Sequence, residues 1–264
     1  MSTMSLSLVA RDSATMLRRS LRHIIRYPVM IVVILGVPVL LLLLFVGVFG
    51  GALNAGINTG THGGKYVDYV VPGILLMAVG YGGSTTAMAV NRDKTEGIIN
   101  RFRTMAIARA SVLTGHVVAA VLRTMASVGL LIGVALLLGF RSSCGPVGWI
   151  AALGVIALLA LALSWLAAAT GLAARNAEGT TGFALVVQLL PLFSSAFVPP
   201  DSMSGAVRWI AQHEPFTPII DTVRGLLTGT AIGDSGVIAV VWCVGLTLVG
   251  YLWARVLFRR DPVR

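Results

Sequence analysis

Apolar runs long enough to cross a bilayer recur along this chain, and they constrain its fold more than any other feature. A hydrocarbon core of about 30 Å needs roughly 20 apolar residues in a helix. The first run, VMIVVILGVPVLLLLLFVGVF, contains no charged residue. We therefore predict an all-α polytopic membrane protein with six transmembrane helices, at residues 29–49, 70–90, 117–140, 147–174, 180–198 and 237–258.

The composition agrees with a membrane protein. The chain is 56% hydrophobic and 11% charged, whereas soluble domains carry about 25% charged residues. Because so few charged side chains cannot cover a water-soluble surface of this size, a soluble enzyme is excluded. Cys144 and Cys243 show no metal-ligand spacing, and Cys243 lies inside an apolar run. We expect both cysteines to be unpaired packing residues.

The basic residues are concentrated in loops that would lie on one side of the membrane. The formal net charge is +10, and most Lys and Arg residues fall in alternate loops, beginning with the N-terminal segment. Cytoplasmic loops of membrane proteins hold such an excess. We therefore predict a multi-pass protein of the plasma (inner) membrane with both termini in the cytoplasm. No base-stacking aromatic residues alternate with the basic ones, so we expect no nucleic acid partner.

The N-terminal segment has an amphipathic pattern. Ala10, Ala14, Leu17, Leu21 and Ile24 recur at helical spacing, and arginines occupy another face. This pattern is typical of a helix that lies on the cytoplasmic leaflet and contacts anionic membrane lipid. The alternative is a topology signal in a flexible tail. We assign residues 1–28 to an interfacial helix and residues 29–264 to the six-span domain.

The cytoplasmic segment after the second run is too polar to span a membrane. Its residues Ile98, Phe102, Met105 and Arg109 nevertheless recur at helical spacing, which predicts a short helix parallel to the membrane at about 92–110. Apolar side chains beside charges suit a docking surface for another protein. They equally suit a solvated loop that rests on the bilayer, and the residues alone leave both interpretations open.

The longest outer connection contains a further apolar stretch, at about 199–230. We predict that Pro215 and Pro218 break this stretch, so that it forms two short helices dipping into the outer leaflet, a re-entrant hairpin. Several acidic residues make this connection more acidic than the cytoplasmic ones.

Catalytic and nucleotide-binding motifs are missing from the sequence. A phosphate-binding loop needs G-x-x-x-x-G-K-[ST], but Lys65 precedes Tyr66 and Lys94 follows Asp93. No Asp or Glu lies inside the six runs, which disfavours coupling to protons or sodium. The histidines are scattered and match no catalytic motif. We expect no catalytic residue, no metal site and no cofactor in this chain, which is then not itself an enzyme.

Polar residues within the apolar runs mark a possible path through the membrane. Ser84, Thr85 and Thr86 cluster in the second run, and Gln188 lies in the fifth. Such residues either line a path or form hydrogen bonds between helices, and the sequence leaves both open.

Two further features of the third run have simple structural interpretations. Arg123 lies some six residues into the run, about 9 Å from its cytoplasmic end, where snorkelling suffices to explain it. Gly129 and Gly133 form a G-x-x-x-G motif, which indicates close packing of two helices.

Two long motifs resemble one known family. RDKTEGIINRFRTMAIARASVLTG, at 92–115, is similar to the coupling segment of daunorubicin-resistance-type drug exporters, and SSAFVPPDSMSGAVRWIAQHEPFTPIIDTVRGLL, at 194–227, is similar to that family's outer pattern. With six spans, these motifs resemble the permease subunit of an ABC type-2 transporter over nearly the whole chain. Ala106 and Ser204 stand where the family often has Pro, which affects loop shape.

The resemblance implies partners and a function. We expect a separate ABC ATPase subunit that carries ATP and Mg, a second permease copy in a homodimer, and a prokaryotic source. The exported compound would be a small apolar or amphipathic substrate, such as an antibiotic. The alternatives are export of a cell-envelope lipid or glycolipid, and a non-transporting membrane immunity or scaffold protein.

The resemblance also implies roles for particular residues. The ATPase-coupling residues would be Glu96, Gly97, Ile98, Arg101, Phe102 and Arg103. Spans two and five would line the path, so the substrate-path residues would be Met77, Ser84, Thr85, Gln188 and Phe193.

Overall fold

The computed structural model describes residues 28–48, 50–51, 66–97 and 109–260, and every regular element in these ranges is helical. This confirms the all-α class. The predicted interfacial helix lies outside the described residues. The elements are α2 (Pro28–Leu43), the π-helix η1 (Leu44–Val48), α4 (Tyr66–Thr95), α6 (Arg109–Leu137), α7 (Pro146–Ala173), η2 (Ala177–Thr180), α8 (Thr181–Leu189), η3 (Leu190–Phe193), η4 (Pro200–Ser202), α9 (Gly205–His213), α10 (Phe216–Thr228) and α11 (Ser235–Arg260).

Four described helices are long and apolar enough to cross a membrane: Tyr66–Thr95, Leu113–Leu137, Pro146–Ala173 and Ser235–Phe258. They confirm the second, third, fourth and sixth predicted spans. The first corresponds to the helical stretch 28–48, α2 followed directly by η1, and the fifth to a shorter apolar helix, Ala177–Phe193, so the count of six stays a prediction.

The fifth apolar run is broken into three pieces, and its sequence explains why. The Asn176 side chain accepts a hydrogen bond from the Gly179 amide at 3.1 Å, which starts the 3-10 turn η2. Pro191 near the start of η3 lacks an N–H and cannot continue the α-helical ladder. The run therefore forms α8 between two 3-10 turns rather than one straight helix.

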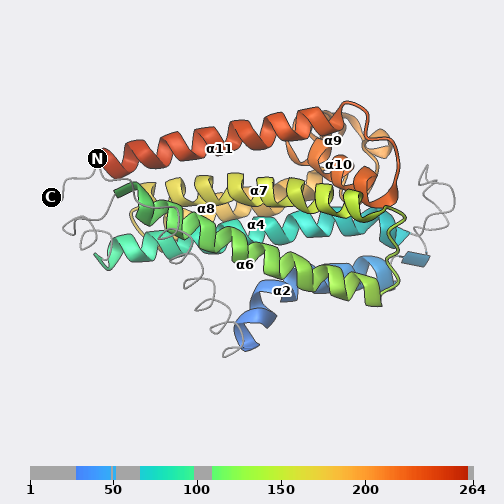
Figure 1. Ribbon diagram of the computed structural model, residues 1–264, viewed down its shortest axis with the longest axis horizontal. Helices are drawn as coiled ribbons and strands as arrows, with labels where there is room; N and C mark the ends of the chain where they lie inside the picture. The colour runs from blue at the N-terminus through green and yellow to red at the C-terminus, as the bar shows by residue number, and fades with distance from the viewer. Residues whose placement is uncertain (1–27, 49, 52–65, 98–108, 261–264) are drawn as a thin grey trace.

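Helix α4 lies at the centre of the bundle (Figure 1). Within the structure, 78% of its apolar window is buried, compared with 22% for α11. Glycines let neighbouring helices approach it. A Cβ at Gly82 would overlap the Thr124 side chain of α6, and one at Gly171 would lie 2.5 Å from the Ala87 carbonyl oxygen of α4.

The G-x-x-x-G motif of α6 does not mark a helix contact in the described structure. A Cβ at Gly129 or Gly133 would meet no atom within 4 Å. Within the described part of the chain, the packing prediction for this motif is therefore wrong, and the close approaches occur at glycines that no motif singles out.

The bundle has two distinct ends (Figure 1). We call one the base, where α4, α7 and α11 end and α6 begins. At the other, the hairpin end, α9 and α10 form the expected pair of short helices. Pro218 does not break this stretch, contrary to the prediction. It lies in the first turn of α10, where a missing N–H costs no helical hydrogen bond.

Candidate functional site

Two of the predicted path residues meet between α4 and α8. Gln188 Nε2 donates a hydrogen bond to Ser84 Oγ at 3.2 Å, and Ser84 Oγ donates to the Gly80 carbonyl oxygen at 3.1 Å. The helices approach closely here, because a Cβ at Gly80 would lie 3.1 Å from Val187. An amide and a hydroxyl thus form a polar contact between the two helices.

Helix α4 is left partly uncovered beside this contact. Ser84 faces α8, and Thr86 accepts a hydrogen bond from Arg123 of α6. At 100° per residue, Thr85 points between these two helices. Tyr81 and Thr85 are half-buried, and Met88 is 52% exposed. We call Tyr81, Thr85 and Met88 the open stripe; it combines polar and apolar side chains on the base half of α4.

The other predicted path residues do not take part in this contact. Met77 is buried in the main core, two turns from Ser84 towards the hairpin end. Phe193 is exposed in η3, beyond the end of α8. Thr85 lies next to the Ser84–Gln188 contact but donates to the Gly82 carbonyl oxygen of its own helix at 2.9 Å. The five residues therefore do not form one pocket in the described structure.

Arg123 is half-buried in α6 and contacts α4. Its Nη2 donates to Thr86 Oγ1 at 3.3 Å. No carboxylate among the described residues pairs with it. A basic group therefore flanks the open stripe on the α6 side.

The predicted coupling segment is described only at its two ends. Residues 92–95 continue α4, and Arg92 Nε pairs with Glu96 Oε1 at 2.7 Å in solvent. Gly97 has φ 73°, a left-handed conformation that ends the helix. Helix α6 starts at Arg109. Ile98, Arg101, Phe102 and Arg103 lie outside the described residues.

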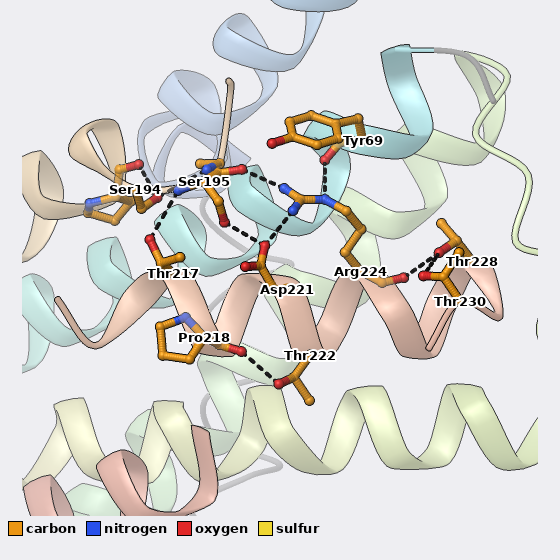
Figure 2. A network of polar contacts seen from close by, with 12 residues as sticks. Tyr69, Ser194, Ser195, Thr217, Pro218, Asp221, Thr222, Arg224, Thr228 and Thr230 are labelled. Carbon is orange, nitrogen blue, oxygen red and sulfur yellow. Dashed lines mark hydrogen bonds and ion pairs between the residues drawn. The ribbon is translucent and has the colours of Figure 1, made fainter. Parts of the chain in front are cut away.

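At the hairpin end, a polar network surrounds Arg224 of α10 (Figure 2). Its side chain is 11% exposed and pairs with Asp221 Oδ1 at 2.6 Å. The guanidinium also donates to the carbonyl oxygens of Tyr69 and Ser195 and stacks 3.8 Å from the centre of the Tyr69 ring. One side chain thus joins α10, the start of α4 and the segment that follows η3.

The network continues to Glu214, which precedes α10. Ser195 Oγ donates to Asp221 Oδ1 at 2.7 Å, and the Ser195 amide donates to Thr217 Oγ1 at 3.2 Å. Buried Glu214 accepts hydrogen bonds from the Phe216 and Thr217 amides and from the Thr217 hydroxyl. Burial raises the pKa of Glu214 to about 7, although these hydrogen bonds act to lower it.

The sequence does not predict this network. From local pattern alone, Glu214, Asp221 and Arg224 are charged residues of an acidic connection. The available signal was the i, i+3 spacing of Asp221 and Arg224 within an apolar stretch. The contacts with Tyr69 and Ser195 join segments far apart in the chain, so no local pattern could reveal them.

The raised pKa of Glu214 predicts a pH-dependent stability. Between about pH 4.5 and 7 the folded protein holds a proton that the unfolded chain releases, so unfolding becomes easier as pH rises through this window, by at most about 3 kcal/mol. Thermal unfolding in detergent should therefore give a lower melting temperature at about pH 8 than at about pH 5. Glu214→Gln cannot titrate and should lose this part of the dependence; an unchanged dependence in that variant would contradict the assignment.

Comparison with known proteins identifies similar chains. A family model described as ABC-2 type transporter matches residues 12–228. The chain is 32% identical over 187 residues to the daunorubicin resistance ABC transporter permease protein DrrB1 of Streptomyces coeruleorubidus, covering 70% of this chain and 65% of that protein. It is 26% identical over 180 residues to the probable doxorubicin resistance ABC transporter permease protein DrrC of Mycobacterium tuberculosis, covering 68% and 65%. The matches thus span just under two thirds of these relatives.

Proposed function

Because the chain belongs to the ABC-2 type transporter family, we propose that it is the permease subunit of an ATP-driven exporter of apolar or amphipathic compounds. The family match over residues 12–228 is the observation that carries this proposal. Relatives named for daunorubicin and doxorubicin resistance favour a drug-like cargo. Four helices of membrane-spanning length supply the required scaffold.

ATP would be hydrolysed on a separate ABC ATPase subunit. The sequence has no phosphate-binding loop, and the energy must therefore reach the chain through a protein contact. We assign this contact to the segment 92–110 at the base, with Glu96, Gly97, Ile98, Arg101, Phe102 and Arg103 as its coupling residues. Helix α4 continues directly into this segment. A movement of the segment, caused by the ATPase, would therefore displace the central helix of the bundle.

The substrate path would run along the open stripe. In a homodimer, a second copy would face Tyr81, Thr85 and Met88, and the exposed apolar side chains of α8 would line the same space. Ser84 and Gln188 would supply polar contacts beside it. Alternating access follows if ATP binding on the partners changes which end of this path is open.

The docking contact predicts the behaviour of a double variant. Arg101→Glu with Phe102→Ala should abolish co-purification of the ATPase subunit, because both the charge and the apolar anchor of the contact are lost. The melting temperature of the permease should stay unchanged. Asp201→Asn, in the exposed ion pair at the hairpin end, is the matched control and should retain the ATPase. A double variant that binds the ATPase and transports normally would refute the docking assignment.

The path assignment predicts a block by a large side chain. Thr85→Trp should fill the open stripe and abolish ATP-driven accumulation of doxorubicin in inverted membrane vesicles, while the ATPase subunit still co-purifies. Leu130→Trp, on an exposed face of α6, should transport normally. Normal transport by Thr85→Trp would exclude this path.

The same vesicles separate the alternative cargoes. Stimulation of ATP hydrolysis by doxorubicin but not by added lipid or glycolipid supports the drug exporter, and the reverse supports export of a cell-envelope lipid. A scaffold or immunity protein would show no stimulation by either, because it has no two transport states for a ligand to discriminate.

A further inference from the structure

Two side chains at the base of α4 hold the end of α7. Asn91 Nδ2 donates to the carbonyl oxygens of Gly171 at 3.1 Å and Ala174 at 2.9 Å. Lys94 Nζ donates to those of Leu172 at 2.6 Å and Ala174 at 3.2 Å. The last carbonyls of a helix have no partner within the helix. Side chains from α4 therefore cap α7, and the ammonium group lies at the negative end of the α7 dipole.

The two helices are also in backbone contact beside these bonds. A Cβ at Gly171 would lie 2.5 Å from the Ala87 carbonyl oxygen and 3.1 Å from the Asn91 amide nitrogen. Asn91 is buried, and Lys94 is half-buried. Close backbone packing with four interhelical hydrogen bonds leaves α4 and α7 little freedom to move separately at the base.

These bonds lie between α8 and residues 96–103, which hold the proposed coupling residues and which we call the docking segment. On one side, α4 ends at Thr95 and leads directly into the docking segment. On the other side, the capped end of α7 passes through the short turn η2 into α8. That turn is itself fixed, since the Asn176 side chain accepts from the Gly179 amide and Thr180 is buried.

We infer that Asn91 and Lys94 are positioning residues that transmit movement of the docking segment, through the end of α7, to α8 and its contact with Ser84. This inference rests on the proposed function, because it requires an ATPase bound at the base. A cap with a merely structural role would stabilise the fold but would leave the response of α8 to nucleotide intact.

The test measures that response in the complex of the whole chain with its ATPase, reconstituted in lipid. Spin labels on Val186→Cys in α8 and Leu130→Cys in α6, both exposed, report the distance between the helices with and without ATP and vanadate, in a Cys144→Ser background. With Asn91 and Lys94 intact, nucleotide should shift this distance. With Lys94→Met added, the ATPase should stay bound and hydrolyse ATP, but the shift should be lost.

Two further variants sharpen the result. Lys94→Arg keeps a donor for the α7 carbonyls and should restore the shift, and Arg175→Met, which removes an exposed cation just after the end of α7, should not affect it. Asn91→Ala should behave like Lys94→Met; if it fails to accumulate, Lys94→Met alone decides. A retained shift in Lys94→Met, or loss of the ATPase from it, would overturn the inference. Absence of the ATPase from the complex with Asn91 and Lys94 intact would instead refute the proposed function.

Discussion

Arg224→Leu is expected to lower the melting temperature of the detergent-purified protein by about 10 °C, because each hydrogen bond from a charged donor contributes about 1.5 to 3 kcal/mol and the variant removes those that Arg224 donates. The Arg224 side chain is 11% exposed. It pairs with Asp221 and donates hydrogen bonds to the carbonyl oxygens of Ser195 and Tyr69. Leucine can supply none of these hydrogen bonds. The carbonyl oxygens of Tyr69 and Ser195 would lose the guanidinium donor, and the Asp221 carboxylate would keep only the Ser195 hydroxyl.

Arg208→Leu is the matched control for this variant. Arg208 forms the same kind of pair, with Asp201 at 2.7 Å, in the same hairpin, but its side chain is 45% exposed. Exposed pairs contribute about 0 to 1 kcal/mol, so the melting temperature should hardly change. Equal losses in the two variants would show that the Arg224 network does not hold the hairpin end together.

Gly171→Ala is expected to destabilise the protein by about 3 kcal/mol, because the new methyl group overlaps backbone rather than a flexible side chain. Its Cβ would lie 2.5 Å from the Ala87 carbonyl oxygen and 3.0 Å from Val90 Cβ. Helices α4 and α7 would have to separate where Asn91 and Lys94 join them. Differential scanning fluorimetry in detergent measures the loss.

Gly154→Ala provides the control on the same helix. A Cβ at Gly154 would meet no atom within 4 Å, and alanine favours a helix over glycine by about 1 kcal/mol. This variant should be neutral or slightly more stable. If Gly171→Ala were equally stable, this result would contradict the close backbone packing of α4 against α7 at Gly171.

The sequence predicted the parts of the fold that depend on local hydropathy. Four spans and the paired short helices α9 and α10 were expected from the lengths of the apolar runs. The central position of α4 was not, because it depends on which glycines face a neighbour. Gly82 and Gly171 make close approaches, whereas the recognisable motif at Gly129 and Gly133 makes none.

The candidate site was predicted only in part, because local sequence patterns reveal polar residues in apolar runs but not contacts between distant segments. Ser84 and Gln188 were singled out as polar residues in apolar runs, and the structure brings them together. Met77 and Phe193 followed from the family resemblance, and one is buried in the core while the other is exposed beyond α8. The Arg224 network and the cap on α7 depend on contacts between distant segments, which single-sequence patterns do not encode.

The central claim is that this chain works as a permease with a separate ATPase. Its most direct test is purification of the tagged chain in mild detergent from cells that make it naturally, followed by identification of the bound proteins and assay of ATP hydrolysis. The account predicts a stoichiometric subunit with a phosphate-binding loop and vanadate-sensitive hydrolysis. A chain that purifies intact and folded without any ATPase, across several mild detergents, would contradict it.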